Sequence, residues 1–226
     1  MRRPLPFLLL AIATACAPPQ RPIAVAPSVN TKETDIAPDA LADTLLVNVQ
    51  TVDPTIAVDL RYATANNFTG SPLPGYQANR AYLRREAASA LAKVQRDLRS
   101  SGLGLKIFDA YRPVRATLAM VDWTERVHRT DLLKDGYIAS RSRHNLGLAI
   151  DLTLIDLTTG NELEMGTPFD TFSAAAHTAN ASGLAAANRQ KLKTAMEAEG
   201  FQNYDQEWWH YTFSVPTPLR FDRPIR

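Results

Sequence analysis

The chain is poor in the side chains on which several kinds of chemistry depend. Its 226 residues contain one cysteine, Cys16, and four histidines. A lone cysteine excludes an intramolecular disulfide, a cysteine-based metal cluster and a catalytic Cys–His pair. Any metal ligands must therefore be His, Asp or Glu.

The chain also lacks an excess of charge of either sign, with 25 basic and 23 acidic residues. The formal net charge is +2, and it becomes zero if Arg2 and Arg3 are removed with a leader segment. Basic residues interleaved with aromatics do not form a stripe anywhere in the sequence, so a nucleic-acid partner is not expected. The length suits one globular domain.

Long hydrophobic runs are also missing. The apolar run from Leu5 to Ala13 is too short to cross a hydrocarbon core of about 30 Å. It follows two arginines and precedes small residues, which predicts a secretory signal peptide over residues 1–15. The small residues before Cys16 resemble the bacterial lipobox, with Ala13 in place of the usual leucine.

Lipidation of Cys16 would make this residue the mature N-terminus, and the alternative is an incidental thiol at a signal peptidase site. Residues 16–43 are rich in proline and small residues, which predicts a tether. The folded domain is predicted to cover residues 44–226. We therefore expect an exported periplasmic or cell-envelope lipoprotein that is attached to the membrane by its lipid.

Hydrophobic periodicity predicts the elements of this domain. Two short strands or a hairpin are expected over 45–52 and 56–60, followed by a loop over 66–77 that is long enough to line a site. Further helices are expected at 83–98, 113–127 and 187–199, and strands at 105–108, 147–155 and 210–215. Strands and helices that do not alternate regularly favour an α+β fold over a doubly wound one.

Three segments concentrate reactive side chains, at 109–113, 142–151 and 207–210. A catalytic zinc ion takes three His or carboxylate ligands and leaves a fourth position for water. His144, Asp151 and His210 supply that set, and Gly147 permits the bend that brings the first two together. We therefore expect one zinc ion per chain.

Two further side chains are expected to take part in catalysis. Glu207 is predicted to be the general base, provided that the backbone turns before His210, since a regular strand would point the two side chains apart. Arg112 is predicted to bind a developing oxyanion or a substrate carboxylate, and Asp109 to orient Arg112 or an adjacent loop. A surface ion pair is the other interpretation of Asp109 and Arg112. The remaining histidines, His128 and His177, are expected to have surface or structural roles.

The motifs Ser-x-His-x-x-Gly-x-Ala-x-Asp at 142–151 and Glu-Trp-Trp-His at 207–210 resemble those of the VanX-type D-alanyl-D-alanine dipeptidases, relatives of the zinc D,D-carboxypeptidases. The resemblance extends to residues 60–64, 67–70, 83–87, 109–113 and 165–170. It implies a hedgehog-like zinc D,D-peptidase fold, in which helices flank a central antiparallel sheet. It also implies the zinc ligands and catalytic residues named above.

The resemblance further implies a set of substrate-binding residues, in which Asp170 meets the substrate's ammonium group. This set comprises Ser142, Tyr62 and Asp170, and we count Asp109 with the substrate-binding residues as well. The expected reaction is hydrolysis of D-Ala-D-Ala to two D-alanines. Because the signal peptide, Cys16 and the tether are foreign to the cytoplasmic resistance enzymes, we expect a role in cell-wall peptide turnover. The alternatives are a zinc D,D-carboxypeptidase acting on stem peptides and a non-catalytic lipoprotein that binds wall peptides.

Overall fold

The computed structural model describes Met1 and residues 35–226 of the chain. The predicted signal peptide, Cys16 and most of the predicted tether lie outside the described residues. Among those that are described, no helix has the length and apolar character needed to cross a membrane.

The folded part begins earlier than predicted. Strand β1 (Ile36–Ala37) pairs in parallel with β9 (Arg220–Phe221), and helix α1 (Asp39–Leu45) buries Ala42. The boundary at residue 43 was therefore wrong. Pro38 is typical of a tether by composition, but here it directly precedes the first residue of α1. At that position a missing backbone N–H costs no hydrogen bond.

The remaining elements follow in chain order. The helices are α2 (Val49–Val52), α3 (Arg85–Arg99), α4 (Val114–Arg126), α5 (Asp131–Lys134) and α6 (Gly183–Ala198), with 3-10 helices η1 (Arg61–Ala63), η2 (Arg143–Leu146) and η3 (Ala174–Ala176). The strands are β2 (Leu46–Asn48), β3 (Ala57–Val58), β4 (Tyr82–Arg84), β5 (Leu103–Asp109), β6 (Ala149–Asp156), β7 (Gln202–Tyr204) and β8 (Glu207–Thr212).

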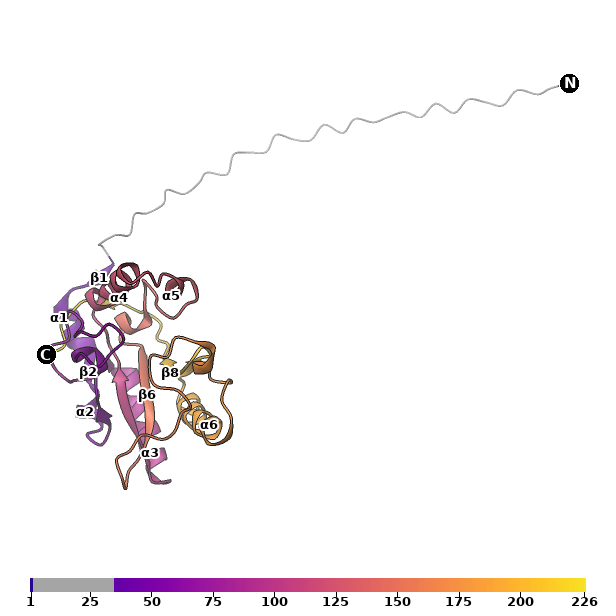
Figure 1. Cartoon of the computed structure of the whole chain (residues 1–226). Coiled ribbons are helices and arrows are strands. Elements are labelled where there is room, and N and C mark those ends of the chain that lie inside the picture. The colour runs from indigo at the N-terminus through magenta and orange to yellow at the C-terminus, as the bar shows by residue number, and fades with distance from the viewer. Residues whose placement is uncertain (2–34) are drawn as a thin grey trace. The chain divides into compact units, whose positions relative to one another are not determined.

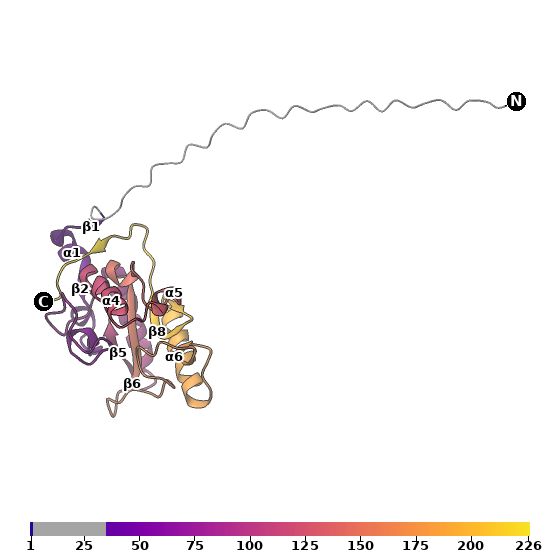
Figure 2. The same ribbon diagram turned by 45° about the horizontal axis from the view of Figure 1, so that its top comes forward.

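The central sheet has five strands in the order β3-β5-β6-β8-β7. Figure 2 shows β6 between β5 and β8. The α+β class is confirmed, but the sheet is mixed and not wholly antiparallel, because β3 runs parallel to β5. The parallel pair is possible because α3 lies in the long connection between the two strands and returns the chain to the same end of the sheet.

Of the two alternatives predicted for residues 45–60, two separate short strands form and a hairpin does not. Strand β2 pairs with β4, whereas β3 pairs with β5. The intervening residues form α2, because the Asn48 side chain accepts a hydrogen bond from the Gln50 backbone N–H at 3.0 Å and so caps the helix. A local cap therefore outweighs the β-branched composition of this segment.

The two long helices α3 and α6 contact each other, and α3 packs on β5 while α6 packs on β6 and β8. Figure 1 shows α4 and α5 at the top of the domain, with α3 and α6 toward its bottom. Buried side chains of β5 and β6, such as Ile107, Leu152 and Leu154, join the helices in one core. Helix α6 begins at Gly183, earlier than predicted.

Candidate metal centre and active site

Three neighbouring strands present acidic and imidazole side chains at the same level of the sheet. Asp151 on β6 pairs in register with Asp109 on β5 and with His210 on β8. Residues directly opposite each other on neighbouring strands project their side chains from the same face. The sheet register therefore brings together residues that lie far apart in the sequence.

A bulge in β5 makes this alignment possible. Ile107 pairs with Leu152 and Asp109 pairs with Asp151, so β5 advances by two residues, past Phe108, while β6 advances by one. Bulges re-aim side chains in this way. In an unbroken register, the Asp109 side chain would instead project from the face of the sheet opposite to that of Asp151.

A larger irregularity places Glu207 beside His210. Asn203 pairs with Tyr211 and Tyr204 pairs with Glu207, so β8 advances by four residues while β7 advances by one. The irregular backbone lets the Glu207 Oε2 atom lie 3.7 Å from the His210 Nδ1 atom. The strand register is thus irregular between Glu207 and Tyr211, in a strand that begins three residues earlier than predicted.

His144 is held by η2. The Ser142 hydroxyl accepts a hydrogen bond from the His144 backbone N–H at 3.2 Å, and the Asn145 Oδ1 atom accepts one from the Ser142 backbone N–H at 3.3 Å. Gly147 ends η2 with a φ of 65°, the left-handed conformation that glycine adopts readily. The predicted bend at Gly147 is confirmed.

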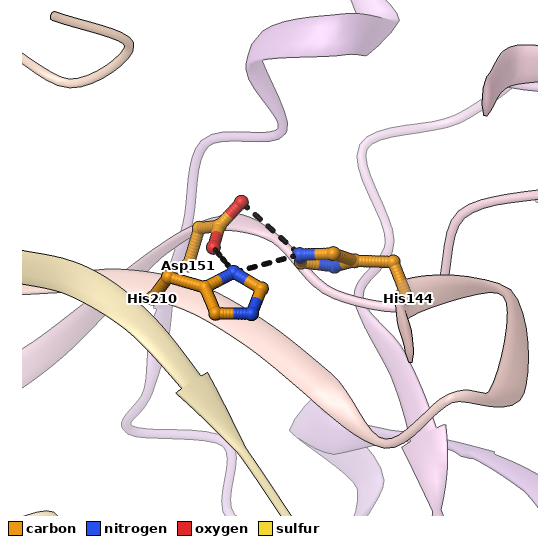
Figure 3. Close-up of side chains that lie close together, drawn as sticks. All are labelled: His144, Asp151 and His210. Carbon is orange, nitrogen blue, oxygen red and sulfur yellow. Dashed lines mark hydrogen bonds and ion pairs between the residues drawn. The ribbon is translucent and has the colours of Figure 1, made fainter. Parts of the chain in front are cut away.

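His144, Asp151 and His210 converge as predicted, and each offers one ligand atom within 4.8 Å of the others. Figure 3 shows the two imidazole rings and the carboxylate directed toward a common point. The Asp151 Oδ1 atom lies 2.8 Å from His210 Nδ1, and Asp151 Oδ2 lies 3.4 Å from His144 Nε2.

The donor chemistry of these three side chains fits a metal ion. The His144 Nδ1 atom lies 2.6 Å from the Ala110 carbonyl oxygen. A carbonyl only accepts, so Nδ1 carries the proton and the Nε2 lone pair faces the other two side chains, as in metal-binding histidines. Burial lowers the pKa of His210 and so favours its neutral, ligating form. Burial opposes ionisation of Asp151, but His144 and His210 outweigh it and hold its pKa below the usual range.

Arg112 is oriented by a buried carboxylate. Its Nε and Nη2 atoms donate to Asp109 Oδ2 at 2.9 and 2.7 Å, and the Tyr76 hydroxyl donates to Asp109 Oδ1 at 2.5 Å. Asp109 is 0% exposed and holds the guanidinium of Arg112, which agrees with the expectation that it orients Arg112. Its expected place among the substrate-binding residues stays a prediction. The surface ion-pair interpretation is wrong, because both partners are buried. Tyr76 went unpredicted as part of this site, although it lies in the loop that was expected to line one.

Two further carboxyl groups face the centre. The Tyr62 hydroxyl lies 3.0 and 3.1 Å from the two Asp170 oxygens. Burial raises the pKa of Asp170, and Asp151 raises it further. Burial also raises the pKa of Glu207, with Asp151 and Asp170 adding to the effect. A cluster of acids therefore makes this site attractive to cations and protons.

These side chains line a cavity of about 390 Å³. The predicted residues on its wall are Tyr62, Arg112, Ser142, His144, Asp151, Asp170, Glu207 and His210. Trp209 also lines it, while Trp208 and Trp209 are both buried, as expected of core residues. His128 is exposed on the surface, and His177 Nε2 lies 3.1 Å from the Tyr137 hydroxyl, so neither lies among the three converging side chains.

Two imidazoles and a carboxylate that converge beside a buried glutamate and a buried arginine define a metallopeptidase centre. The chain matches the peptidase M15 model, described as D-Ala-D-Ala dipeptidase, over residues 42–220. It therefore belongs to the D-Ala-D-Ala dipeptidase family.

Curated relatives share most of their length with the chain. It is 39% identical to a D-alanyl-D-alanine dipeptidase of Enterococcus faecium over 186 residues, which cover 74% of this chain and 92% of the relative. A D-alanyl-D-alanine dipeptidase of Streptomyces coelicolor is 38% identical over 184 residues, 74% of this chain and 91% of the relative. Among solved structures, the vancomycin-resistance D,D-dipeptidase VanXYg matches with 20% identity and a TM-score of 0.41, over 64% of this chain and 56% of that one.

Proposed function

We propose that the chain hydrolyses D-alanyl-D-alanine to two D-alanines, with one zinc ion held by His144, Asp151 and His210. The convergence of these three side chains beside Glu207, in a cavity the size of a small peptide site, carries the proposal. Membership of the family and the names of its curated relatives support the choice of substrate.

When bound, the zinc ion would lower the pKa of a water molecule and polarise the scissile carbonyl. Glu207 would accept the proton from the attacking water and pass it to the leaving amine. Its position beside His210 suits this role, and its raised pKa makes it a stronger base than an ordinary carboxylate.

Arg112 would donate to the oxyanion that develops on the scissile carbonyl. Burial disfavours its charge, but the Asp109 carboxylate outweighs burial and raises the pKa of Arg112, so the guanidinium stays cationic. Asp109 and Tyr76 hold the guanidinium in place before substrate arrives. A preorganised donor stabilises a transition state more than one that must first reorient.

Asp170, Tyr62 and Ser142 would bind the substrate. The Asp170 carboxylate offers a counter-ion for the free ammonium group of a dipeptide, and the Tyr62 hydroxyl positions it. The Ser142 hydroxyl already accepts a bond from the His144 backbone, but it still has a proton to donate toward the cavity.

The test compares D-Ala-D-Ala with N-acylated D-Ala-D-Ala as substrates of the zinc-loaded chain. Cleavage of the free dipeptide with little cleavage of the acylated peptide is expected. Efficient cleavage of the acylated peptide would favour a D,D-carboxypeptidase. A chain that binds zinc but cleaves neither would point to a non-catalytic role in binding wall peptides.

We further propose that the protein is an exported lipoprotein, with lipid on Cys16 and a proline-rich tether, that acts in cell-wall peptide turnover. The apolar run before small residues and Cys16 supports this. Incorporation of a labelled fatty acid into the wild-type chain, and its loss in Cys16→Ser, are expected. A deletion that alters vancomycin sensitivity but not growth on D-Ala-D-Ala would contradict the turnover role.

A further inference from the structure

A second cavity, of about 850 Å³, adjoins the catalytic cavity. It is lined by the segment that follows η1, by Phe108 and Thr153 on the sheet, and by residues 162–170. Phe68 and Asp170 line both cavities. These two residues form the boundary between the cavities, and we call them the Phe68–Asp170 wall.

The backbone on either side of Phe68 is held by the side chain of Asn67. Its Nδ2 atom donates to the Thr64 and Ser71 carbonyl oxygens at 2.7 and 2.9 Å, and its Oδ1 atom accepts from the Thr69 backbone N–H at 2.8 Å. One amide thus ties together both arms of the loop. The backbone at Phe68 is fixed and does not need substrate to order it.

The Phe68 ring is confined as tightly as its backbone. It packs edge to face against Trp123 and Phe172, with ring centroids 4.9 and 5.0 Å apart, and against Tyr62 at 6.0 Å. Aromatic pairs with this geometry are favourable beyond their buried area. The ring cannot swing aside without losing three such contacts.

Asp170, the other residue of the Phe68–Asp170 wall, favours a positively charged group on the substrate. Asp170 accepts from Tyr62, and its φ of 59° is a conformation that few residues other than glycine adopt. Its carboxylate would attract the free ammonium group of a dipeptide, so the amino end of the substrate would face the wall. An added residue at that end would replace the ammonium with an amide and would need the space beyond.

The second cavity offers that space on the same face of the sheet. Thr153 is two residues from Asp151 on β6, so both side chains project from one face. The Thr153 hydroxyl is buried, and among the described residues it has no hydrogen-bond partner. Phe108 and Trp208 add apolar surface. Arg61 and Glu162 also line this cavity, so a peptide unit would find hydrogen-bonding groups and an apolar lining there.

We propose that Phe68 is a specificity-determining residue, which restricts cleavage to free dipeptides by closing the catalytic cavity off from the second one. The inference rests on the proposed dipeptidase function and names the residue that sets its limit on substrate length. Removing the ring would connect the two cavities and admit a residue on the amino side of D-Ala-D-Ala.

The test uses the full zinc-loaded chain with D-Ala-D-Ala and L-alanyl-D-alanyl-D-alanine. The ratio of kcat/KM for the tripeptide to that for the dipeptide is expected to rise at least about tenfold in Phe68→Ala, and less in Phe68→Leu. Phe201→Leu is the matched control, because Phe201 is a buried aromatic residue that packs on Phe213 and lines neither cavity. Its ratio should stay at the wild-type value.

A ratio in Phe68→Ala that equals the wild-type ratio, in a chain that still cleaves the dipeptide, would overturn the inference. So would a wild-type chain that cleaves both peptides equally well. If the alanine variant does not fold, Phe68→Leu decides by the same ratio. A wild-type chain that is inactive on D-Ala-D-Ala would overturn the proposed function and the inference with it.

Discussion

The carboxylate of Glu207 is surrounded by other acids. Burial, Asp151 and Asp170 all raise its pKa, while Arg112 only partly offsets them. A carboxylate in such surroundings gains more from taking up a proton than one in water does. Its surroundings therefore favour a residue that exchanges protons over one that holds a permanent charge.

Glu207→Gln keeps the size of the side chain but removes the base. We expect kcat to fall by about 10²–10⁴-fold, the usual contribution of general base catalysis, with zinc content unchanged. Activity assays and metal analysis of the same preparation check this. Glu199→Gln, which alters an acid paired with Lys93 on the surface, is the control. Turnover at the wild-type rate would remove Glu207 from the mechanism.

Asp109 acts on catalysis through Arg112. In Asp109→Asn the buried guanidinium loses its charged partner, so we expect kcat to fall by about 10-fold or more and the free energy of unfolding to fall by roughly 3–5 kcal/mol. Tyr76→Phe removes one hydrogen bond from the same carboxylate and should cost about 1 kcal/mol. Kinetics and denaturant titrations measure both. An Asp109→Asn chain with wild-type kcat would show that Arg112 needs no such support.

At the scale of elements, strong hydrophobic periodicity predicted helices and strands correctly. The apolar spacing of Leu91, Val94 and Leu98 predicted α3, and the alternation around Asp151 predicted β6. Both signals are local. The short strands β2 and β3 form within the predicted ranges, but their pairing was not predictable because their partners, β4 and β5, lie far along the chain.

The candidate site was predictable in its residues but not in its geometry. The motifs around His144, Asp151 and His210 indicated the ligands, because the chain has only four histidines and two of them lie in segments with other reactive side chains. The bulge at Phe108 and the irregularity after Glu207 depend on strand pairing, which no local pattern encodes. The burial of the Asp109–Arg112 pair could not be predicted for the same reason.

The link between η2 and β6 depends on one glycine. A Cβ atom added at Gly147 would lie 2.5 Å from Leu46 Cδ2 and 3.2 Å from the Arg84 backbone nitrogen. The φ of Gly147 is 65°. We expect Gly147→Ala to cost about 1–3 kcal/mol of unfolding free energy and to weaken zinc binding by displacing His144. Thermal unfolding and metal titration test this.

Gly160→Ala is the matched control for the glycine prediction. Gly160 also has a positive φ, of 74°, but an added Cβ would meet nothing within 4 Å. Its cost should be limited to the backbone strain, about 1 kcal/mol, with zinc affinity unchanged. Equal losses in the two variants would show that the contact with Leu46 has no effect.

At the scale of the whole molecule, the metal centre connects η2 to the middle of the sheet. Zinc that binds only the folded chain should stabilise it by about 4 kcal/mol at a free concentration 1,000 times the Kd. We expect a chelator to lower Tm and abolish activity, and zinc to restore both. His144→Ala should show a Tm that no longer responds to zinc. A wild-type Tm that is indifferent to chelation would contradict a linkage between metal and folding.

The alignment of Asp109, Asp151 and His210 across three strands also bears on how the sheet assembles. A slip of one residue between β6 and β8 would turn His210 to the other face and break the ligand set. Misaligned sheets would therefore bind zinc poorly, while the native alignment would bind it well. During folding, zinc would therefore select the native strand register, and the same ligands would serve both catalysis and correct assembly of the sheet.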